Sequence, residues 1–143
     1  MGSSHWEFFI PIKPVPASRP RFARSGRIYY GKNYRIFRSE AASLLDRWSP
    51  PSFDFPLHGP LAVASRFVVP SPKKTNRVAP RGDVDNYFKT LDVLNGFFWH
   101  DDDQLVWASM TKEYGECPGI YLQVQSVERV PETRTLSQMW EQG

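Results

Sequence analysis

The segment from Arg81 to Gln104 constrains the fold more than any other part of this 143-residue chain. It contains Asp83 and Asp85 and then, after an aromatic run, the acidic cluster Asp101–Asp103. Carboxylates repel one another, so a fold gains no stability by bringing them together. Hard divalent cations prefer oxygen ligands and are the usual reason for such a gathering. The sequence therefore predicts a Mg²⁺ site here, in which Mn²⁺ can substitute.

Residues 84–94 have the spacing of an amphipathic helix within this segment. Asp83 precedes the pattern as a candidate N-cap, and Gly96 follows it as a helix-ending residue. The apolar residues on or beside one stripe are Val84, Tyr87, Phe88, Leu91 and Leu94.

Each acid near this helix also has a purely structural explanation. An Asp before a helix is usually a cap, and Asp85 is favoured by the helix dipole and by an i,i+4 pair with Lys89. Asn86 fits a first-turn role as well as it fits a ligand. The metal hypothesis therefore depends on the combination of these residues with Asp101–Asp103.

The net charge of +3 conceals a strong asymmetry along the chain. Residues 1–82 contain 14 Lys/Arg and 4 Asp/Glu, whereas residues 83–143 contain 4 Lys/Arg and 11 Asp/Glu. A basic half favours a polyanionic partner, and an acidic cluster beside it favours metal ions acting on a phosphate-rich substrate. Solvated faces whose segregation disappears on folding explain the charges equally well.

Two basic stretches are candidates for nucleic-acid contact. Residues 13–38 contain eight Lys/Arg, no acid and interleaved aromatics; arginine binds phosphate in a bidentate manner, and aromatic rings can stack on bases. Residues 72–80 form a second basic loop that leads into the acidic segment, although a solvated loop is the alternative. The predicted DNA-binding residues are Arg19, Arg21, Arg24, Lys73, Lys74, Arg77 and Arg81.

The remaining patterns predict a small α/β (α+β) domain, with a mixed sheet flanked by helices, over residues 1–130. Residues 131–143 are expected to form a tail or short helix. Residues 13–27 are expected to be a loop, and Asn33 is expected to cap the first helix. The predicted strands span residues 6–12, 27–30, 61–69, 104–110 and 119–127, and the first helix spans 33–48.

The lone cysteine, Cys117, excludes an intrachain disulfide and favours a reducing compartment. No apolar run is long enough to span a membrane, and the N-terminus lacks the pattern of a signal peptide. We therefore expect a cytoplasmic protein with no membrane partner.

The pattern R-G-D-V-D-N-Y-F-K, followed by L-N-G and D-D-D-Q-L, resembles the RusA family of Holliday-junction resolvases, of phage or prophage type. The resemblance covers most of residues 6–128. It implies that Asp83 and Asp85 are paired metal-binding aspartates and that Lys89 is the catalytic lysine. It also implies that Asp102 is the third essential aspartate and that Asp101 is the acid before it.

Several neighbouring residues receive no catalytic role from this resemblance. Asp103 stands where the family varies, and Asp92 comes one residue earlier than in the family pattern. His100 is interpreted as a loop histidine near the site, although a general base is the alternative. The aromatic run 97–99 is interpreted as core or interface.

The resemblance implies a Mg²⁺-dependent endodeoxyribonuclease that resolves four-way DNA junctions by paired symmetric nicks. Two nicks of like polarity require two sites, which a two-fold homodimer supplies. Two alternatives remain: a nuclease that acts on other branched DNA such as forks or flaps, and a non-catalytic DNA-binding protein with the same fold.

Overall fold

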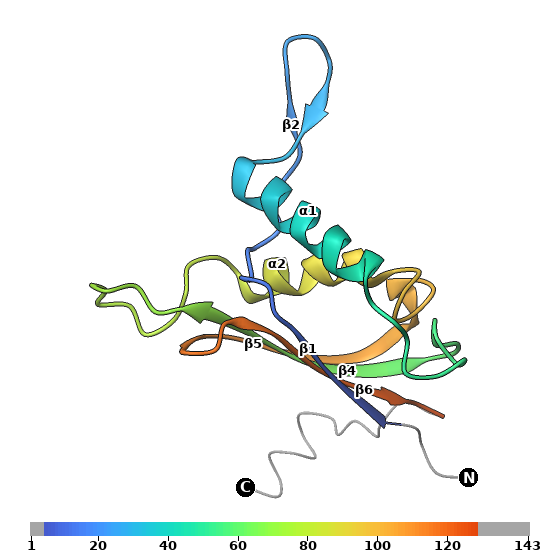
Figure 1. Ribbon diagram of the computed structural model, residues 1–143. Coiled ribbons are helices and arrows are strands. Elements are labelled where there is room, and N and C mark those ends of the chain that lie inside the picture. Colours follow the sequence, from blue (N-terminus) through green and yellow to red (C-terminus); the bar gives the residue numbers. More distant parts are fainter. Residues whose placement is uncertain (1–4, 129–143) are drawn as a thin grey trace, which may run out of the picture.

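The computed structural model describes residues 5–128 and shows one small α+β domain (Figure 1). The expected tail, residues 131–143, lies outside the described residues. The elements are β1 (His5–Ile10), β2 (Arg21–Phe22), β3 (Ile28–Tyr29), α1 (Lys32–Asp46), β4 (Leu61–Pro70), α2 (Val84–Phe88), the 3₁₀ helices η1 (Lys89–Leu94) and η2 (Asp102–Gln104), β5 (Leu105–Gly115) and β6 (Gly119–Ser126).

Four strands form a mixed sheet in the order β1-β6-β4-β5. β6 is antiparallel to both β1 and β4, whereas β4 and β5 are parallel. A parallel pair needs a long crossover, and residues 71–104, which contain α2 and η1, provide it. α1 and α2 lie on the same face of the sheet (Figure 1). The predicted fold class, a mixed sheet with helices, is confirmed.

The core lies between this sheet face and the helices. Leu61, Val63 and Phe67 of β4 alternate toward it and are fully buried, as the two-residue period of a strand requires. α1 contributes Phe37 and Ala41 from its expected apolar stripe. The other large buried side chains include Trp99, Leu91, Leu94, Ile120, Leu122 and Val124.

α1 begins and ends earlier than the sequence pattern predicted. Gly31, not Asn33, occupies the N-cap, and the Gly31 N–H donates to Ser18 Oγ at 3.3 Å. The helix ends at Asp46 because the chain then tightens, with the Trp48 N–H donating to the Leu45 carbonyl at 3.1 Å. The prediction that Asn33 caps this helix is therefore wrong.

The sequence predicts a loop over residues 13–27, but this segment is not entirely irregular. Arg21 and Phe22 of β2 pair with Tyr29 and Ile28 of β3, and together they form a hairpin that projects from the domain beyond α1 (Figure 1). Its turn uses Gly26 at φ +82, where a side chain would be strained. The strand predicted over residues 27–30 is present as β3, whereas the two residues of β2 carry too little periodicity to be recognised in a sequence.

Candidate active site and nucleic-acid interface

Asp83 and Asp85 lie at the start of α2 and are exposed. Asp83 occupies the N-cap position, yet its side chain makes no capping hydrogen bond. Asp85 forms no ion pair with Lys89. The ion pairs within residues 5–128 are Arg38–Asp92 and Arg66–Glu113. Lys89 Nζ instead donates to Asn86 Oδ1 at 3.4 Å. Neither capping nor ion pairing therefore explains why carboxylates occupy these two positions. For Asp85 the remaining local stabilisation is the dipole of a five-residue helix.

The turn before Asp83 is held by side chains that donate hydrogen bonds to three successive backbone carbonyl groups. Lys112 of β5 donates from Nζ to the Pro80 carbonyl at 2.8 Å and also to the Gly82 carbonyl. The Tyr87 hydroxyl donates to the Arg81 carbonyl at 2.7 Å. Burial raises the pKa of Tyr87, which keeps its hydroxyl protonated and able to donate. The chain therefore enters α2 in one fixed direction.

Gly82 has a specific reason to be glycine in this turn. Its φ is +96, and a Cβ there would lie 3.0 Å from Pro16 Cγ. Any larger residue would be strained and would displace the segment that leads toward β2. The position of Asp83 thus depends on close backbone packing as well as on hydrogen bonds.

The helix predicted over residues 84–94 is an α-helix only as far as Phe88, and residues 89–94 form η1. A 3₁₀ helix has about three residues per turn, so Lys89 and Asp92 face the same side of it. Asp92 Oδ1 accepts a hydrogen bond from Arg38 Nη1 of α1 at 3.3 Å. Gly96 has φ +86, in the left-handed conformation expected for a residue that follows a helix.

Asp101 and Gln104 enclose the short helix η2 in a capping box. Asp101 Oδ1 accepts from the Asp103 N–H at 3.3 Å, and Gln104 Oε1 accepts from the Asp101 N–H at 3.0 Å. Asp101 therefore has a structural role beside any metal-binding role. Asp102, between them, is exposed and takes no part in the two bonds of the capping box.

In this acidic segment, the carboxyl group with a raised pKa is that of Asp102. Hydrogen bonding with Asp101, desolvation and repulsion from Asp101 and Asp92 raise the pKa of Asp102, and a backbone hydrogen bond only partly offsets them. Crowded like charges that lack a cation cost stability. A bound cation would lower the pKa of Asp102 and relieve this repulsion.

Within one chain, Asp83 and Asp85 do not gather with Asp101 and Asp102 in a single site. Repulsion from Asp92 contributes to the raised pKa of Asp102, whereas neither Asp83 nor Asp85 is among the groups that raise it. Residues 5–128 contain no group of three or more His, Cys, Asp or Glu side chains close enough to hold a metal ion. Asp83 and Asp85 therefore form one part of the acidic surface, and Asp101 and Asp102 form another.

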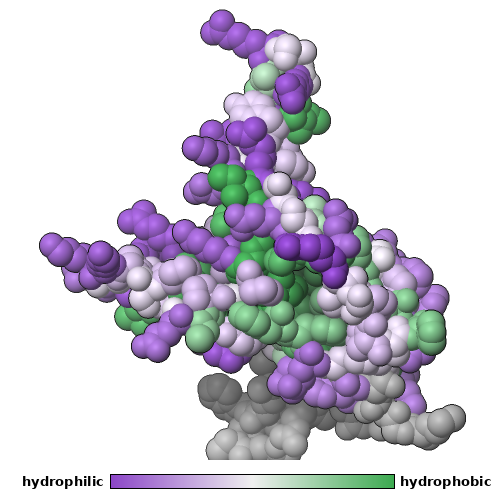
Figure 2. Space-filling model, viewed as in Figure 1, coloured by the Kyte–Doolittle hydropathy of each residue, from purple (hydrophilic) through white to green (hydrophobic). Residues whose placement is uncertain are grey.

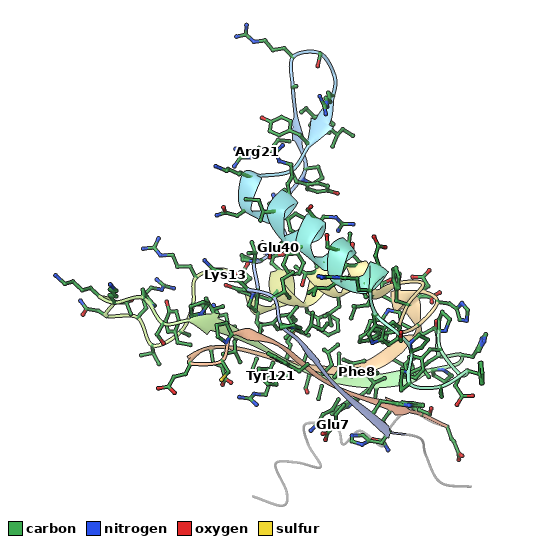
Figure 3. All side chains as sticks on the ribbon, in the orientation of Figure 1. Glu7, Phe8, Lys13, Arg21, Glu40 and Tyr121 are labelled. Atoms are coloured by element: carbon green, nitrogen blue, oxygen red, sulfur yellow. The ribbon has the colours of Figure 1, made fainter. Side chains whose placement is uncertain are left out.

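Two basic arms project from the domain. The first is the hairpin, residues 19–29, and the second is the loop 71–81 that leads into Asp83; hydrophilic side chains gather on both, with apolar ones among them on the first (Figure 2). Figure 3 places Arg21 on the first arm and Lys13 nearer the sheet. Every predicted DNA-binding residue is exposed: Arg19, Arg21, Arg24, Lys73, Lys74, Arg77 and Arg81.

The bases of both arms meet at α2. The Ala17 N–H, at the base of the first arm, donates to the Asn86 carbonyl at 2.8 Å. The second arm ends in the Lys112-bound turn. The first arm also exposes apolar rings: Phe22 is 74% and Tyr29 41% exposed, so they remain free to contact bases. Asp83 and Asp85 thus lie where two cationic projections converge.

The expected site is an open surface rather than an enclosed pocket. An apolar hollow of about 500 Å³ lies between β1, α1 and η1, lined by residues such as Phe8, Leu44 and Trp48, and none of the predicted site residues lines it. An exposed site between projecting cationic arms suits a polymer whose phosphates remain partly solvated.

The interpretation of the aromatic run holds for its two most buried members. Phe98 and Trp99 are buried in the core, and Trp99 Nε1 donates to Asn95 Oδ1 at 2.8 Å. His100 is exposed, and its Nε2 lies 3.3 Å from His58 Nε2.

Sequence reasoning missed two residues that hold the site. Gln104 has a readable signal, because Asp101-x-x-Gln104 is the spacing of a capping box. Lys112 has none, since its partners lie some thirty residues earlier in the chain and meet it only in the folded sheet.

No helix within residues 5–128 is long and apolar enough to cross a membrane.

Comparison with known proteins agrees with the fold. A family model described as endodeoxyribonuclease RusA matches residues 11–125. The chain is also similar to a Bacillus subtilis protein named "Uncharacterized protein YqaN", at 25% identity over 139 residues, covering 85% of this chain and 96% of that protein. The matched region contains every residue of the two acidic groups and both basic arms. The chain therefore belongs to the RusA family of endodeoxyribonucleases.

Proposed function

We propose that this protein is a Mg²⁺-dependent, structure-selective endonuclease that resolves four-way DNA junctions by paired symmetric nicks. The observation that carries the proposal is the state of Asp83 and Asp85, which are exposed, free of structural partners among residues 5–128, and placed where two basic arms converge. Its expected place of action is the cytoplasm of a bacterial or phage-infected host cell.

The donor set fits a hard divalent cation in its chemistry. Asp83, Asp85 and Asp102 offer carboxylate oxygens, which Mg²⁺ and Mn²⁺ prefer. Asp101 would contribute its remaining oxygen, since Oδ1 is used within η2. When bound, the metal would activate a water molecule and neutralise charge on the reacting phosphate.

The chain's own residues would bind and orient the substrate. Lys89 lies one turn after Asp85, and its ammonium would donate to a non-bridging oxygen of the scissile phosphate. The arginines of the first arm and the lysines of the second would bind flanking phosphates. The fixed turn at Gly82 would keep Asp83 in place without reorganisation during the reaction.

We propose that the working unit is a homodimer. Two nicks need two sites, and a two-fold axis supplies them with the symmetry of a junction. The separation of Asp85 from Asp102 within one chain supports a further element of the proposal. A second copy would bring its Asp102 to the Asp83 and Asp85 of the first.

Cleavage of synthetic DNA tests the proposal against its alternatives. The protein is incubated with Mg²⁺ and a four-way junction, a fork, a flap or a linear duplex of shared sequence. Paired nicks in opposing strands of the junction are expected. Cleavage of forks or flaps alone would support the other branched-DNA nuclease, and binding without any cleavage would support a non-catalytic DNA-binding protein.

A further inference from the structure

Two histidines from separate loops lie against each other at the surface. Nε2 of His58 and Nε2 of His100 are 3.3 Å apart, and the ring centroids are 4.3 Å apart with the planes tilted by 42°. Both side chains are exposed. We propose that this histidine pair binds a borderline transition-metal ion of the Zn²⁺ class, in a site chemically distinct from the carboxylates proposed to hold Mg²⁺.

One side-chain amide holds the backbone of both histidines. Gln104 Oε1 accepts from the N–H of His100 at 2.8 Å, while Gln104 Nε2 donates to the carbonyls of Leu57 and Gly59, each at 2.9 Å. These two carbonyls flank His58. The Leu57 N–H also donates to the Phe98 carbonyl at 2.9 Å. The two imidazoles are thus presented by a fixed pair of loops, not by independent mobile ones.

The separation of the two nitrogens matches a shared ion. Zn²⁺ binds imidazole nitrogen at about 2.0–2.1 Å in tetrahedral sites, which places two such nitrogens roughly 3.3–3.4 Å apart. The same 3.3 Å also fits a hydrogen bond between the rings, in which donor and acceptor depend on the tautomers. The ring centroids, at 4.3 Å, are closer together than those of two imidazoles aimed at one ion, so both rings would turn to bind it.

The remaining coordination positions would be open. No third His, Cys, Asp or Glu side chain in the described part of the chain completes a protein cage, so water or a phosphate oxygen would fill them, as in open zinc sites. Imidazole suits Zn²⁺, Cu²⁺ and Ni²⁺, whereas Mg²⁺ prefers oxygen. The ion would link the loop at residues 57–59 to His100, the residue immediately before the acidic cluster Asp101–Asp103.

The third histidine provides a matched control. The chain has three His residues, and His5 lies on β1, apart from the pair. Zn²⁺ is titrated by calorimetry into the full, tag-free chain and into the variants His58→Ala, His100→Ala and His5→Ala. We expect each change within the pair to weaken Zn²⁺ binding by more than about tenfold, and His5→Ala to match wild type.

Copper spectroscopy gives an independent readout that does not depend on affinity. Electron paramagnetic resonance of the Cu²⁺-loaded chain should show two coordinated nitrogens, and each single variant of the pair should show one. Circular dichroism checks that the variants fold, and His58→Gln and His100→Gln replace any alanine variant that does not. Zn²⁺ binding unchanged in His58→Ala/His100→Ala would overturn the proposal and leave the pair as a hydrogen bond only. This test does not depend on nuclease activity.

Discussion

Lys112 on β5 is hydrogen-bonded to the carbonyl oxygen of Gly82, the residue immediately before Asp83. The same ammonium binds the Pro80 carbonyl. A residue far along the chain therefore fixes the turn that delivers the carboxylate pair. This turn preorganises Asp83 for its proposed role.

Replacing Lys112 should destabilise the fold and weaken cleavage. Lys112→Met leaves the carbonyls of buried Pro80 and of Gly82 without their charged donor, so the free energy of unfolding should fall by about 1.5–3 kcal/mol. Urea denaturation measures it. Lys74→Met is the matched control, because Lys74 is exposed and makes no hydrogen bond in the described structure. Equal stability of the two variants would show that the turn does not depend on Lys112.

Gln104 is expected to be a positioning residue for the acidic cluster. Gln104→Ala removes four hydrogen bonds that join residues 57–59 to residues 100–101, and should lower the free energy of unfolding by about 1–3 kcal/mol. Gln104→Glu should not restore stability, because a carboxylate cannot donate to the two carbonyls. Gln123→Ala, on an exposed strand position, serves as control. A Gln104→Glu protein as stable as wild type would contradict the assigned hydrogen bonds.

The first basic arm should contribute to the salt dependence of DNA binding. The triple variant Arg19→Ala/Arg21→Ala/Arg24→Ala should bind a junction more weakly and lower the slope of log affinity against log salt by roughly 0.9 for each phosphate that is no longer neutralised. Electrophoretic mobility shifts between low and physiological salt measure this slope. Arg66→Ala is the control, because Arg66 pairs with Glu113 within the sheet. An unchanged slope in the triple variant would mean that the arm is only a solvated surface.

The shared-site proposal makes a distinctive prediction for mixed dimers. Asp83→Asn and Asp102→Asn proteins should each be inactive alone. If Asp102 serves the partner's Asp83, a dimer with one chain of each kind contains one intact site and should nick the junction once. If each site lies within one chain, both sites of the mixed dimer are damaged. Subunits are exchanged before assay, and persistent inactivity after verified exchange would contradict sharing between copies.

Much of the scaffold could be predicted because it follows from short-range periodicity. The alternation of Leu61, Val63 and Phe67 predicts a buried strand, and the stripe through Phe37 and Ala41 predicts a helix face. The sequence motif also selected the acidic residues, whose role stays a prediction. These features depend on neighbours within one or two turns of the chain.

The geometry of the site could not be predicted in the same way. The change from α2 to η1 and the bonds of Lys112 depend on tertiary packing, which no local pattern encodes. The sequence motif assigned the carboxylates to one metal site. Within one folded chain, however, Asp83 and Asp85 lie apart from Asp101 and Asp102.

The most direct test of the central claim compares cleavage, binding and stability in Asp83→Asn and Asp102→Asn proteins. Hydrogen bonding with Asp101, desolvation and repulsion raise the pKa of Asp102, so its ionised form lowers stability as the pH rises above its ordinary pKa. At neutral pH, Asp102→Asn should therefore be as stable as wild type, or more stable by up to about 1 kcal/mol because this carboxyl is exposed and screened. Both variants should still bind a four-way junction, since removing negative charge does not weaken phosphate contacts. Mg²⁺-dependent cleavage should fall at least about a hundredfold in each. Cleavage by either folded variant at close to the wild-type rate would contradict the account.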